Sequence, residues 1–267
     1  MPDTSKSSAT TFPSQWRVRG LITWNLLAGL LLMSWVWEPT RLLWDLFDDA
    51  LFVDLNLRLA DAKPWARLWA FLNLRPMDIA SGLLMLPFVI RSGFIFPTAK
   101  VRAALLTFVA LLLLALALRV TFDYGIVKPL EMSRASPSLT VPGSVRLSEL
   151  FPDWVIPVKD SSVTSFPGDH ASIALVWALL LSLFARGWRL LVVWGVTAIL
   201  LLPRLVAGAH WGSDDFVGGL FVALLSIGWG CYTPYCAKVE CALERAITPL
   251  RELLVRMPLL RRLRFLN

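Results

Sequence analysis

Long apolar runs limit the folds open to this chain more than any other feature of its sequence. The chain has 267 residues, 57% of them hydrophobic, and the apolar residues gather in runs rather than in the short alternating patterns of a soluble core. A helix needs roughly 20 apolar residues to cross a hydrocarbon core of about 30 Å, because unpaired backbone amides cannot be left in lipid. The sequence therefore predicts an all-α integral membrane protein. Its six expected spans are residues 20–37, 78–97, 103–120, 171–185, 189–206 and 215–233.

The distribution of charge predicts how these spans are oriented. The net charge of +7 would suggest nucleic-acid binding in a soluble protein, but the basic residues gather on one side of the spans. The two termini and the turns near 91–102 and 186–189 hold fifteen basic and four acidic residues, whereas the other loops hold eleven basic and fifteen acidic residues. The positive-inside rule then places both termini in the cytoplasm and loops 38–77, 120–170 and 204–215 outside. We expect the membrane, and no nucleic acid, as a partner.

The membrane part of the chain is expected at 16–237, with polar or amphipathic segments around it. Residues 1–15 are rich in Ser and Thr, which predicts disorder. Residues 41–61 carry aspartates between apolar positions at helical spacing, which predicts an amphipathic helix on the outer surface. Residues 238–267 alternate apolar and basic residues, so this tail is expected to lie on the anionic inner leaflet.

Three cysteines lie near the cytoplasmic end of the last predicted span. Cys231, Cys236 and Cys241 have no histidine close by and no spacing that closes a zinc site. They are interpreted as structural thiols, with reversible acylation of a juxtamembrane cysteine as the alternative.

Both histidines of the chain fall where predicted outward loops meet the membrane. His170 opens the fourth span, and His210 precedes the sixth. A single histidine at a helix end is commonly a cap or a surface residue. Two histidines on the same face, each beside a carboxylate and near an arginine, favour a catalytic site instead.

The second histidine lies in the stretch PRLVAGAHWGSDD, between Arg204 and Asp214. If this stretch is helical from residue 210, His210 and Asp214 share one helix face, and the carboxylate fixes the tautomer of the imidazole. His210 is then the candidate nucleophile toward phosphorus. Arg204 lies in an apolar run, where it either meets an anion such as phosphate or extends its head to the interface.

The first histidine ends the sequence PGDH. The backbone amides at the start of the following helix, from Gly168 onward, suit a phosphate, and His170 is the candidate general acid for the leaving oxygen. Lys128 and Arg134 add two cations that could neutralise a transferring phosphoryl group.

These blocks resemble the signature of the type 2 phosphatidic acid phosphatase superfamily, written K-x6-RP, then PSGH, then SR-x5-H-x3-D. The third block matches at Arg204, His210 and Asp214, with Pro203 in place of the serine. The resemblance implies a bundle of six spanning helices whose active site lies at the outer membrane boundary. It also implies that His210 forms a phosphohistidine.

The other two blocks depart from the signature. Gly168 and Asp169 take the Ser and Gly positions of the second block, while His170 is kept. Lys128 is one residue nearer to Arg134 than the first block asks, and a proline does not follow the arginine directly. An added carboxylate beside a phosphate site needs a partner, so Asp169 either pairs with an arginine or helps to place the acceptor.

Four pieces of the chain resemble one branch of the superfamily, the lipid A 1-diphosphate synthases: residues 134–140, 146–151, 158–172 and 203–215. This resemblance implies a phosphotransferase that moves phosphate from undecaprenyl diphosphate to the 1-phosphate of lipid A, outside the inner membrane of Gram-negative bacteria. It implies catalysis without a metal or other cofactor, because arginine, lysine and helix amides neutralise the charge. Two alternatives stay open. One is a phosphatase that uses water as the acceptor, and the other is a non-catalytic membrane carrier or scaffold. The sequence does not fix the oligomeric state.

Overall fold

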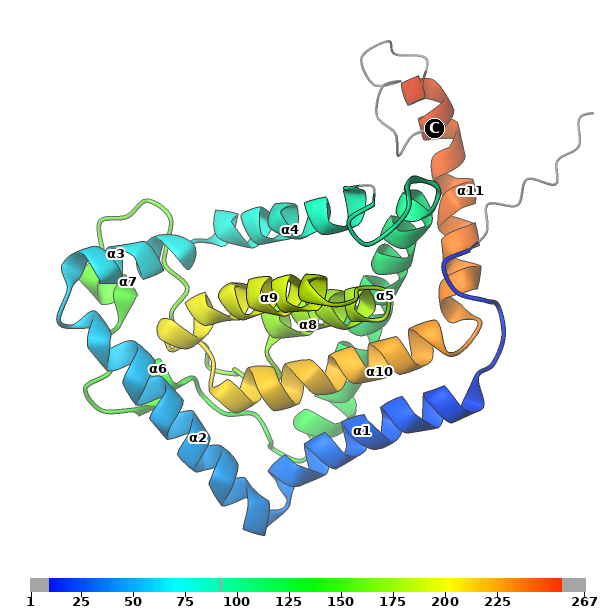
Figure 1. Ribbon diagram of the computed structural model, residues 1–267. Coiled ribbons are helices and arrows are strands. Elements are labelled where there is room, and N and C mark those ends of the chain that lie inside the picture. Colours follow the sequence, from blue (N-terminus) through cyan, green and yellow to red (C-terminus); the bar gives the residue numbers. More distant parts are fainter. Residues whose placement is uncertain (1–9, 92, 256–267) are drawn as a thin grey trace, which may run out of the picture.

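The computed structural model describes residues 10–91 and 93–255, and helices dominate this part of the chain (Figure 1). The longer helices are α1 (Val18–Val36), α2 (Glu38–Asn56), α3 (Lys63–Leu72), α4 (Arg75–Ile90), α5 (Val101–Phe122), α8 (Asp169–Ser182), α9 (Trp188–Val206), α10 (Leu220–Cys231) and α11 (Tyr235–Val255). The short helical segments are η1 (Leu57–Leu59), η2 (Thr98–Lys100), η3 (Asp123–Val127), α6 (Pro137–Thr140), α7 (Leu147–Leu150) and η4 (Asp214–Gly219). The prediction of an all-α fold is confirmed.

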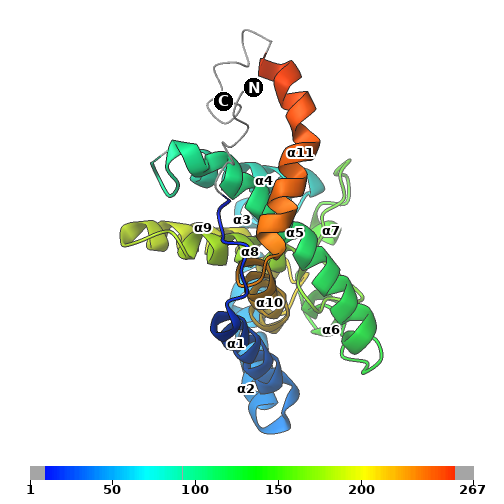
Figure 2. The same cartoon turned by 90° about the vertical axis from the view of Figure 1, so that its right-hand side faces the viewer.

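Helix α10 forms the centre of the bundle. It contacts α1, α5 and α8, and α8 in turn contacts α9 (Figure 2). The continuous helical stretch Asp214–Cys231 is 78% buried, whereas Val18–Val36 is only 11% buried. Leu111, Val176 and Ile227 from α5, α8 and α10 meet in the main core. The outer helices carry exposed apolar side chains, among them Leu30, Leu116 and Leu191, as expected of surfaces that face lipid.

Four helices in the described residues are long and apolar enough to cross a membrane: Val18–Val36, Thr98–Val127, Trp188–Val206 and Asp214–Cys231. The other two predicted spans are shorter than expected. Helix α4 has 16 residues with Pro87 inside it, and α8 has 14 residues. The count of six spans therefore stays a prediction.

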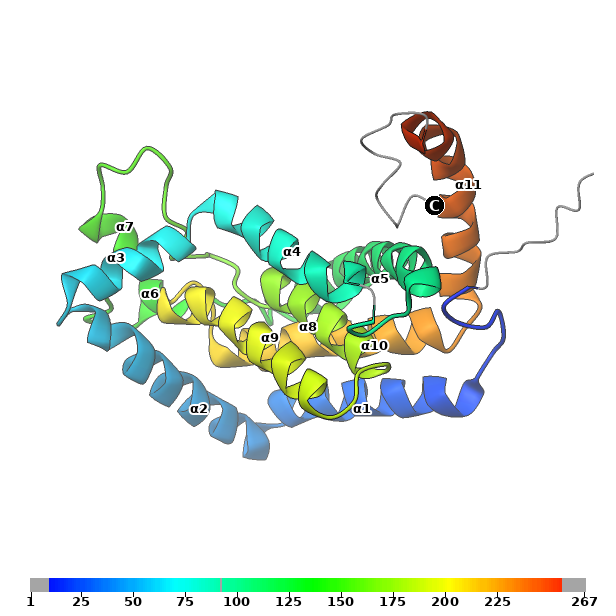
Figure 3. The same ribbon diagram turned by 45° about the horizontal axis from the view of Figure 1, so that its top comes forward.

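The helices around the bundle separate into two ends. Helices α2, α3, α6 and α7 lie at one end, and α11 runs across the opposite end (Figures 1 and 3). Helix α4 leads from the α3 end back toward the beginning of α5 (Figure 3). Since α9 ends and η4 begins at the α2 and α3 end, the histidine loops and the basic tail helix lie at opposite ends of the molecule.

The amphipathic segments differ in detail from the prediction for 41–61. Helix α2 begins at Glu38 and ends at Asn56, and the separate helix α3 follows after a short turn. Helix α2 also has a buried side, because Asp48, Phe52 and Asn56 point into the protein. Helix α2 therefore packs into the protein with one side, whereas the sequence predicts a helix that lies on the outer surface.

The two terminal segments are only partly described. Residues 1–9 and 256–267 lie outside the described residues. Within the segment predicted to be disordered, Phe12 packs against Phe184 and the backbone N–H of Thr11 donates to Glu240, so residues 10–15 follow a defined path. The basic tail is helical as far as Val255.

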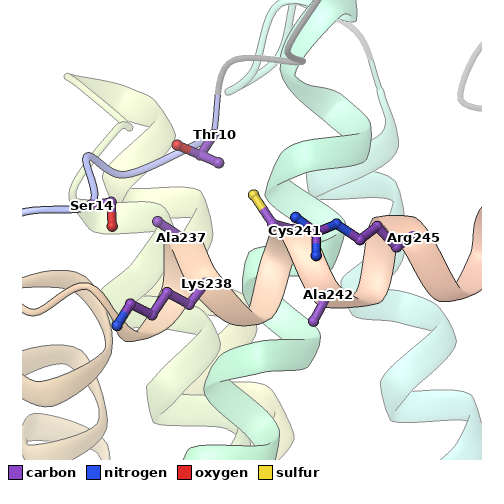
Figure 4. Close-up of a pocket in the computed structure, with 7 residues that line it drawn as sticks. All are labelled: Thr10, Ser14, Ala237, Lys238, Cys241, Ala242 and Arg245. Atoms are coloured by element: carbon purple, nitrogen blue, oxygen red, sulfur yellow. The ribbon is translucent and has the colours of Figure 1, made fainter.

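A surface cavity of about 430 Å³ lies between α11 and the N-terminal segment (Figure 4). It is lined by Thr10, Ser14, Ala237, Lys238, Cys241, Ala242 and Arg245. Cys241 is exposed there, whereas Cys231 and Cys236 are buried. This cavity is at the opposite end of the molecule from the histidines.

Candidate functional site

The end of α9 determines where His210 lies. Gly208 has a φ of +71°, a backbone conformation that side chains with a Cβ rarely adopt, and its carbonyl accepts the N–H of Ser138 at 3.1 Å. The glycine turns the chain out of the helix, so that His210 stands in a bend before the next helical residues begin at Gly212. The condition that the stretch be helical from residue 210 is therefore not met.

His210 is held by a backbone carbonyl and is almost fully buried. Its Nδ1 lies 2.9 Å from the carbonyl oxygen of Ser165 and 3.6 Å from the carboxylate of Asp214, and the residue is 7% exposed. A carbonyl can only accept, so Nδ1 carries the hydrogen. Nε2 is then the ring nitrogen whose lone pair remains for chemistry.

The charges around His210 favour its protonated form. Burial lowers the pKa of the imidazole, but the neighbouring carboxylates of Asp214 and Asp215 outweigh this, and the pKa is raised above its ordinary value. The ring is therefore protonated over a wider pH range than a histidine in water.

We expect Asp214→Asn to lower the pKa of His210, because burial then acts against the charged ring with one carboxylate fewer. Histidine ring NMR can follow this directly, since the chain has only two histidines. His170→Gln identifies the remaining signal, and Asp45→Asn, on the exposed side of α2, is a matched control. A pKa of His210 that stays the same or rises in Asp214→Asn would contradict the electrostatic role of Asp214.

Arg134 joins three parts of the chain. Its Nη2 donates to Asp48 at 2.7 Å and to the hydroxyl of Ser213, and lies 3.3 Å from Asp214. Its guanidinium also lies 4.9 Å from the ring centroid of Trp211. Asp48, which is 1% exposed, accepts from the backbone N–H of Ser213 at 2.7 Å. Burial raises the pKa of Asp48, against the opposing effect of Arg134.

The segment from Ser165 to His170 packs against both neighbouring blocks. The N–H of Ser165 donates to the carbonyl of Arg134, and the N–H of Gly168 donates to the carbonyl of Asp214, both at 2.9 Å. Gly168 is closely packed, since a Cβ added to it would collide with Oδ1 of Asp215. The structure thus brings together the three blocks that the sequence predicts.

Arg204 and His170 meet around a carboxylate of α4. Nη2 of Arg204 donates to Oδ1 of Asp78 at 2.7 Å, and Nε2 of His170 lies 2.9 Å from the same oxygen. The two basic groups are themselves 3.4 Å apart. Nη1 of Arg204 donates to the side chain and carbonyl of Asn73 and to the carbonyl of Lys159. Arg204 is 3% exposed, so its head group stays inside the protein.

Lys128 and Asp169 stand at the edge of this arrangement. The ammonium of Lys128 lies 3.0 Å from Asp123 and over the ring of Tyr124, directed toward η3. Asp169 pairs with Arg119 at the end of α5. Of the two roles left open for Asp169, pairing with an arginine is present here, and a role in placing an acceptor stays a prediction.

The arrangement suits an anion more than a metal ion. Within the described part of the chain, no three His, Cys, Asp or Glu side chains come together in a way that could hold a metal. Arg134 and Arg204 carry fixed charge, and both histidines are within the same set of blocks. Such a site can hold a phosphate and attack it.

Comparison with known proteins finds a related protein whose name states its activity. The chain is 28% identical over 231 residues to lipid A 1-diphosphate synthase of Escherichia coli (strain K12), covering 85% of this chain and 93% of the relative. No protein-family model matches the chain. No solved structure matches it either. The resemblance that the motifs predict is confirmed by this relative.

Proposed function

We propose that the chain is a membrane phosphotransferase that moves a phosphate from undecaprenyl diphosphate to the 1-phosphate of lipid A through a phosphohistidine on His210. The relative's name supports lipid A 1-diphosphate as the product. The donor follows from the motif resemblance. One structural observation carries the chemistry: the Ser165 carbonyl accepts from Nδ1 of His210, so that in the neutral ring Nε2 carries the lone pair that acts as the nucleophile.

In the first step, Nε2 of His210 attacks the terminal phosphorus of the donor. The bond from phosphorus to the bridging oxygen breaks, and undecaprenyl monophosphate leaves with a proton supplied by His170. The imidazolium character that develops on His210 is stabilised by Asp214, whose carboxylate lies 3.6 Å from Nδ1. Arg134 and Arg204 balance the charge on the phosphoryl oxygens.

In the second step, an oxygen of the acceptor's 1-phosphate attacks the phosphohistidine. The bond from phosphorus to Nε2 breaks, and lipid A 1-diphosphate forms. His170, neutral after the first step, takes up the acceptor's proton where the acceptor phosphate carries one. The enzyme returns to its starting state.

The proposed location is the bacterial inner membrane, with both termini in the cytoplasm and the active site on the periplasmic side. The basic residues Lys238 and Arg245 of α11 and Arg17 and Arg19 at the start of α1 support this orientation, because these parts of the helices lie at the end opposite the histidine loops (Figure 1). A periplasmic site gives His210 access to lipids of the outer leaflet.

Hydrolysis is the second candidate, since water can also resolve a phosphohistidine. The half-exposed ion pair of Arg119 and Asp169 favours transfer over hydrolysis. It places a cation and a carboxylate at the beginning of α8, and we propose that the acceptor head group binds there. Lys128 keeps its proposed part in binding phosphate. The N–H of Gly168 already donates to the carbonyl of Asp214, so the backbone amides proposed for phosphate begin at Asp169.

With purified protein and labelled undecaprenyl diphosphate, we expect lipid A to gain the mass of one phosphate while free phosphate stays a minor product. The acceptor phosphate occupies the place that water would need, and this limits hydrolysis. Mass spectrometry of lipid A and a phosphate dye, applied to the same sample, give the ratio of the two products. A sample without lipid A is the control.

Phosphate release at an unchanged rate, with no gain of mass in lipid A, would make the protein a phosphatase. Asp169→Gly should move the ratio toward free phosphate if Asp169 places the acceptor. If the ratio does not change, Asp169 only pairs with Arg119.

A further inference from the structure

One oxygen of Asp78 contacts both basic groups that the proposed reaction uses at this part of the site. Its Oδ1 accepts from Nη2 of Arg204 at 2.7 Å and lies 2.9 Å from Nε2 of His170. The proposed reaction needs the first group to bind phosphate and the second to reach the leaving oxygen. One carboxylate oxygen therefore contacts both groups at the atoms they would use.

The other terminal nitrogen of Arg204, Nη1, is already committed to protein acceptors. Nη1 is saturated by Asn73 and by the carbonyl of Lys159, with donor to acceptor distances from 3.0 to 3.3 Å. The edge of the guanidinium that can receive a substrate anion is the Nη2 edge, where Asp78 sits. The planar fork of Arg204 cannot serve phosphate and Asp78 fully at the same time.

The exposure of the partners shows which of them can withdraw. The side chain of Arg204 is 4% exposed, whereas that of Asp78 is 39% exposed. Arg204 is enclosed by the protein, whereas Asp78, in the first turn of α4, is partly open to solvent. When a phosphate binds, the Asp78 carboxylate can turn toward water with a small loss of free energy. The Arg204 guanidinium cannot, because the protein encloses it.

We propose that Asp78 sets the affinity of the site for substrate by acting as a built-in competitor, an anion that holds Arg204 and His170 until a phosphate group displaces it. This inference rests on the proposed function for the identity of the substrate phosphate. It assigns a role in substrate binding to a residue of α4 that lies outside the three motif blocks. Asp78 also gives buried Arg204 a counter-charge while no substrate is bound. Without Asp78, Arg204 would be an unpaired charge inside the protein.

The test is the binding of inorganic phosphate to the purified full-length protein in detergent. We expect Asp78→Asn to lower the dissociation constant for phosphate roughly tenfold, which corresponds to a site closed by Asp78 about nine-tenths of the time. The empty variant should unfold at a lower temperature than the wild type, and saturating phosphate should stabilise the variant more than the wild type. Asp78→Ala should change phosphate affinity in the same direction.

A matched control is Asp45→Asn in α2. Asp45 also pairs with an arginine, Arg41, at 2.9 Å and is 45% exposed, but it is not part of the Arg204 group. Its removal should leave phosphate affinity unchanged. Asp78→Glu keeps the negative charge, so its affinity for phosphate should stay close to that of the wild type. This variant keeps the test informative if the neutral variants fold poorly.

The opposite result would overturn the proposal. If Asp78 instead supports the phosphate site, Asp78→Asn should weaken phosphate binding or leave it unchanged, and Asp78→Glu should weaken it. In turnover, competition predicts a lower KM for the lipid diphosphate with no rise in kcat. Phosphate binding needs no turnover, so a wild type that fails to phosphorylate lipid A refutes the proposed function and leaves this inference standing.

Discussion

His210→Ala abolishes both the phosphoenzyme and turnover, if His210 is the nucleophile. The bond from phosphorus to nitrogen has no substitute in the site, because His170 is the only other histidine in the chain and its Nε2 faces Asp78 and Arg204. The acid-labile phosphoenzyme can be trapped after a short exposure to radiolabelled lipid diphosphate and followed on gels at neutral and at acid pH.

Loss of activity alone would not identify the nucleophile, since His210 also bonds the Ser165 carbonyl that connects two blocks of the site. His210→Asn is a useful companion, because its amide can still donate to that carbonyl while lacking a nucleophilic nitrogen. Both variants should bind inorganic phosphate in the manner of the wild type. Phosphoenzyme that persists in either variant would remove His210 from this role.

The second large effect is expected for His170→Ala, which should reduce turnover by roughly 10²- to 10⁴-fold, the range typical for the loss of a general acid. The size of the loss should depend on the leaving group. A lipid monophosphate leaves poorly without a proton, whereas p-nitrophenolate leaves well, so the variant should retain more of its activity toward p-nitrophenyl phosphate. The ratio of the two rates, in the variant and in the wild type, is the measurement.

An equal loss for both leaving groups would assign His170 to binding or positioning instead of proton transfer. His170→Gln separates these outcomes further, because glutamine can donate a hydrogen bond to a phosphate but cannot transfer a proton at neutral pH. If the glutamine variant recovers full activity, His170 is not the acid.

The sequence indicates those parts of the site that need histidine, which occurs only twice in the chain, and arginine within apolar segments. Two histidines and two arginines at the same predicted face were enough to indicate an anion site, and the structure brings their blocks into contact at Ser165 and Gly168. The exception is Lys128, whose proposed phosphate contact stays a prediction, because the ammonium pairs with nearby Asp123.

Sequence reasoning missed the carboxylates that hold the arginines. Asp48 reaches Arg134 across 86 residues of chain, and Asp78 reaches Arg204 across 126. Periodicity describes neighbours along one helix and carries no information about such distant pairs. A signal did exist, because an aspartate at the start of a predicted span is costly in lipid unless it has a partner.

The lengths of the spans were also only partly predictable. Hydropathy depends on composition, and the predicted spans 20–37 and 189–206 agree closely with the helices Val18–Val36 and Trp188–Val206, because those helices are continuous and mostly exposed on the bundle surface. Helix α8 ends after 14 residues, and α4 begins at Arg75 and ends at Ile90, three residues after Pro87. Both helices pack against neighbours along the bundle, so tertiary contacts with α5 and α9 help to determine their ends.

The close packing of Gly168 against Asp215 makes these two positions interdependent in protein engineering. Serine at 168, as in the general superfamily motif, would place its Cβ against the Asp215 carboxylate. Serine therefore requires the Asp215 carboxylate to shift or to be replaced by a smaller side chain. An attempt to convert the second block to the general pattern should therefore compare Gly168→Ser alone with Gly168→Ser combined with Asp215→Ala, and the double variant should be the more stable of the two.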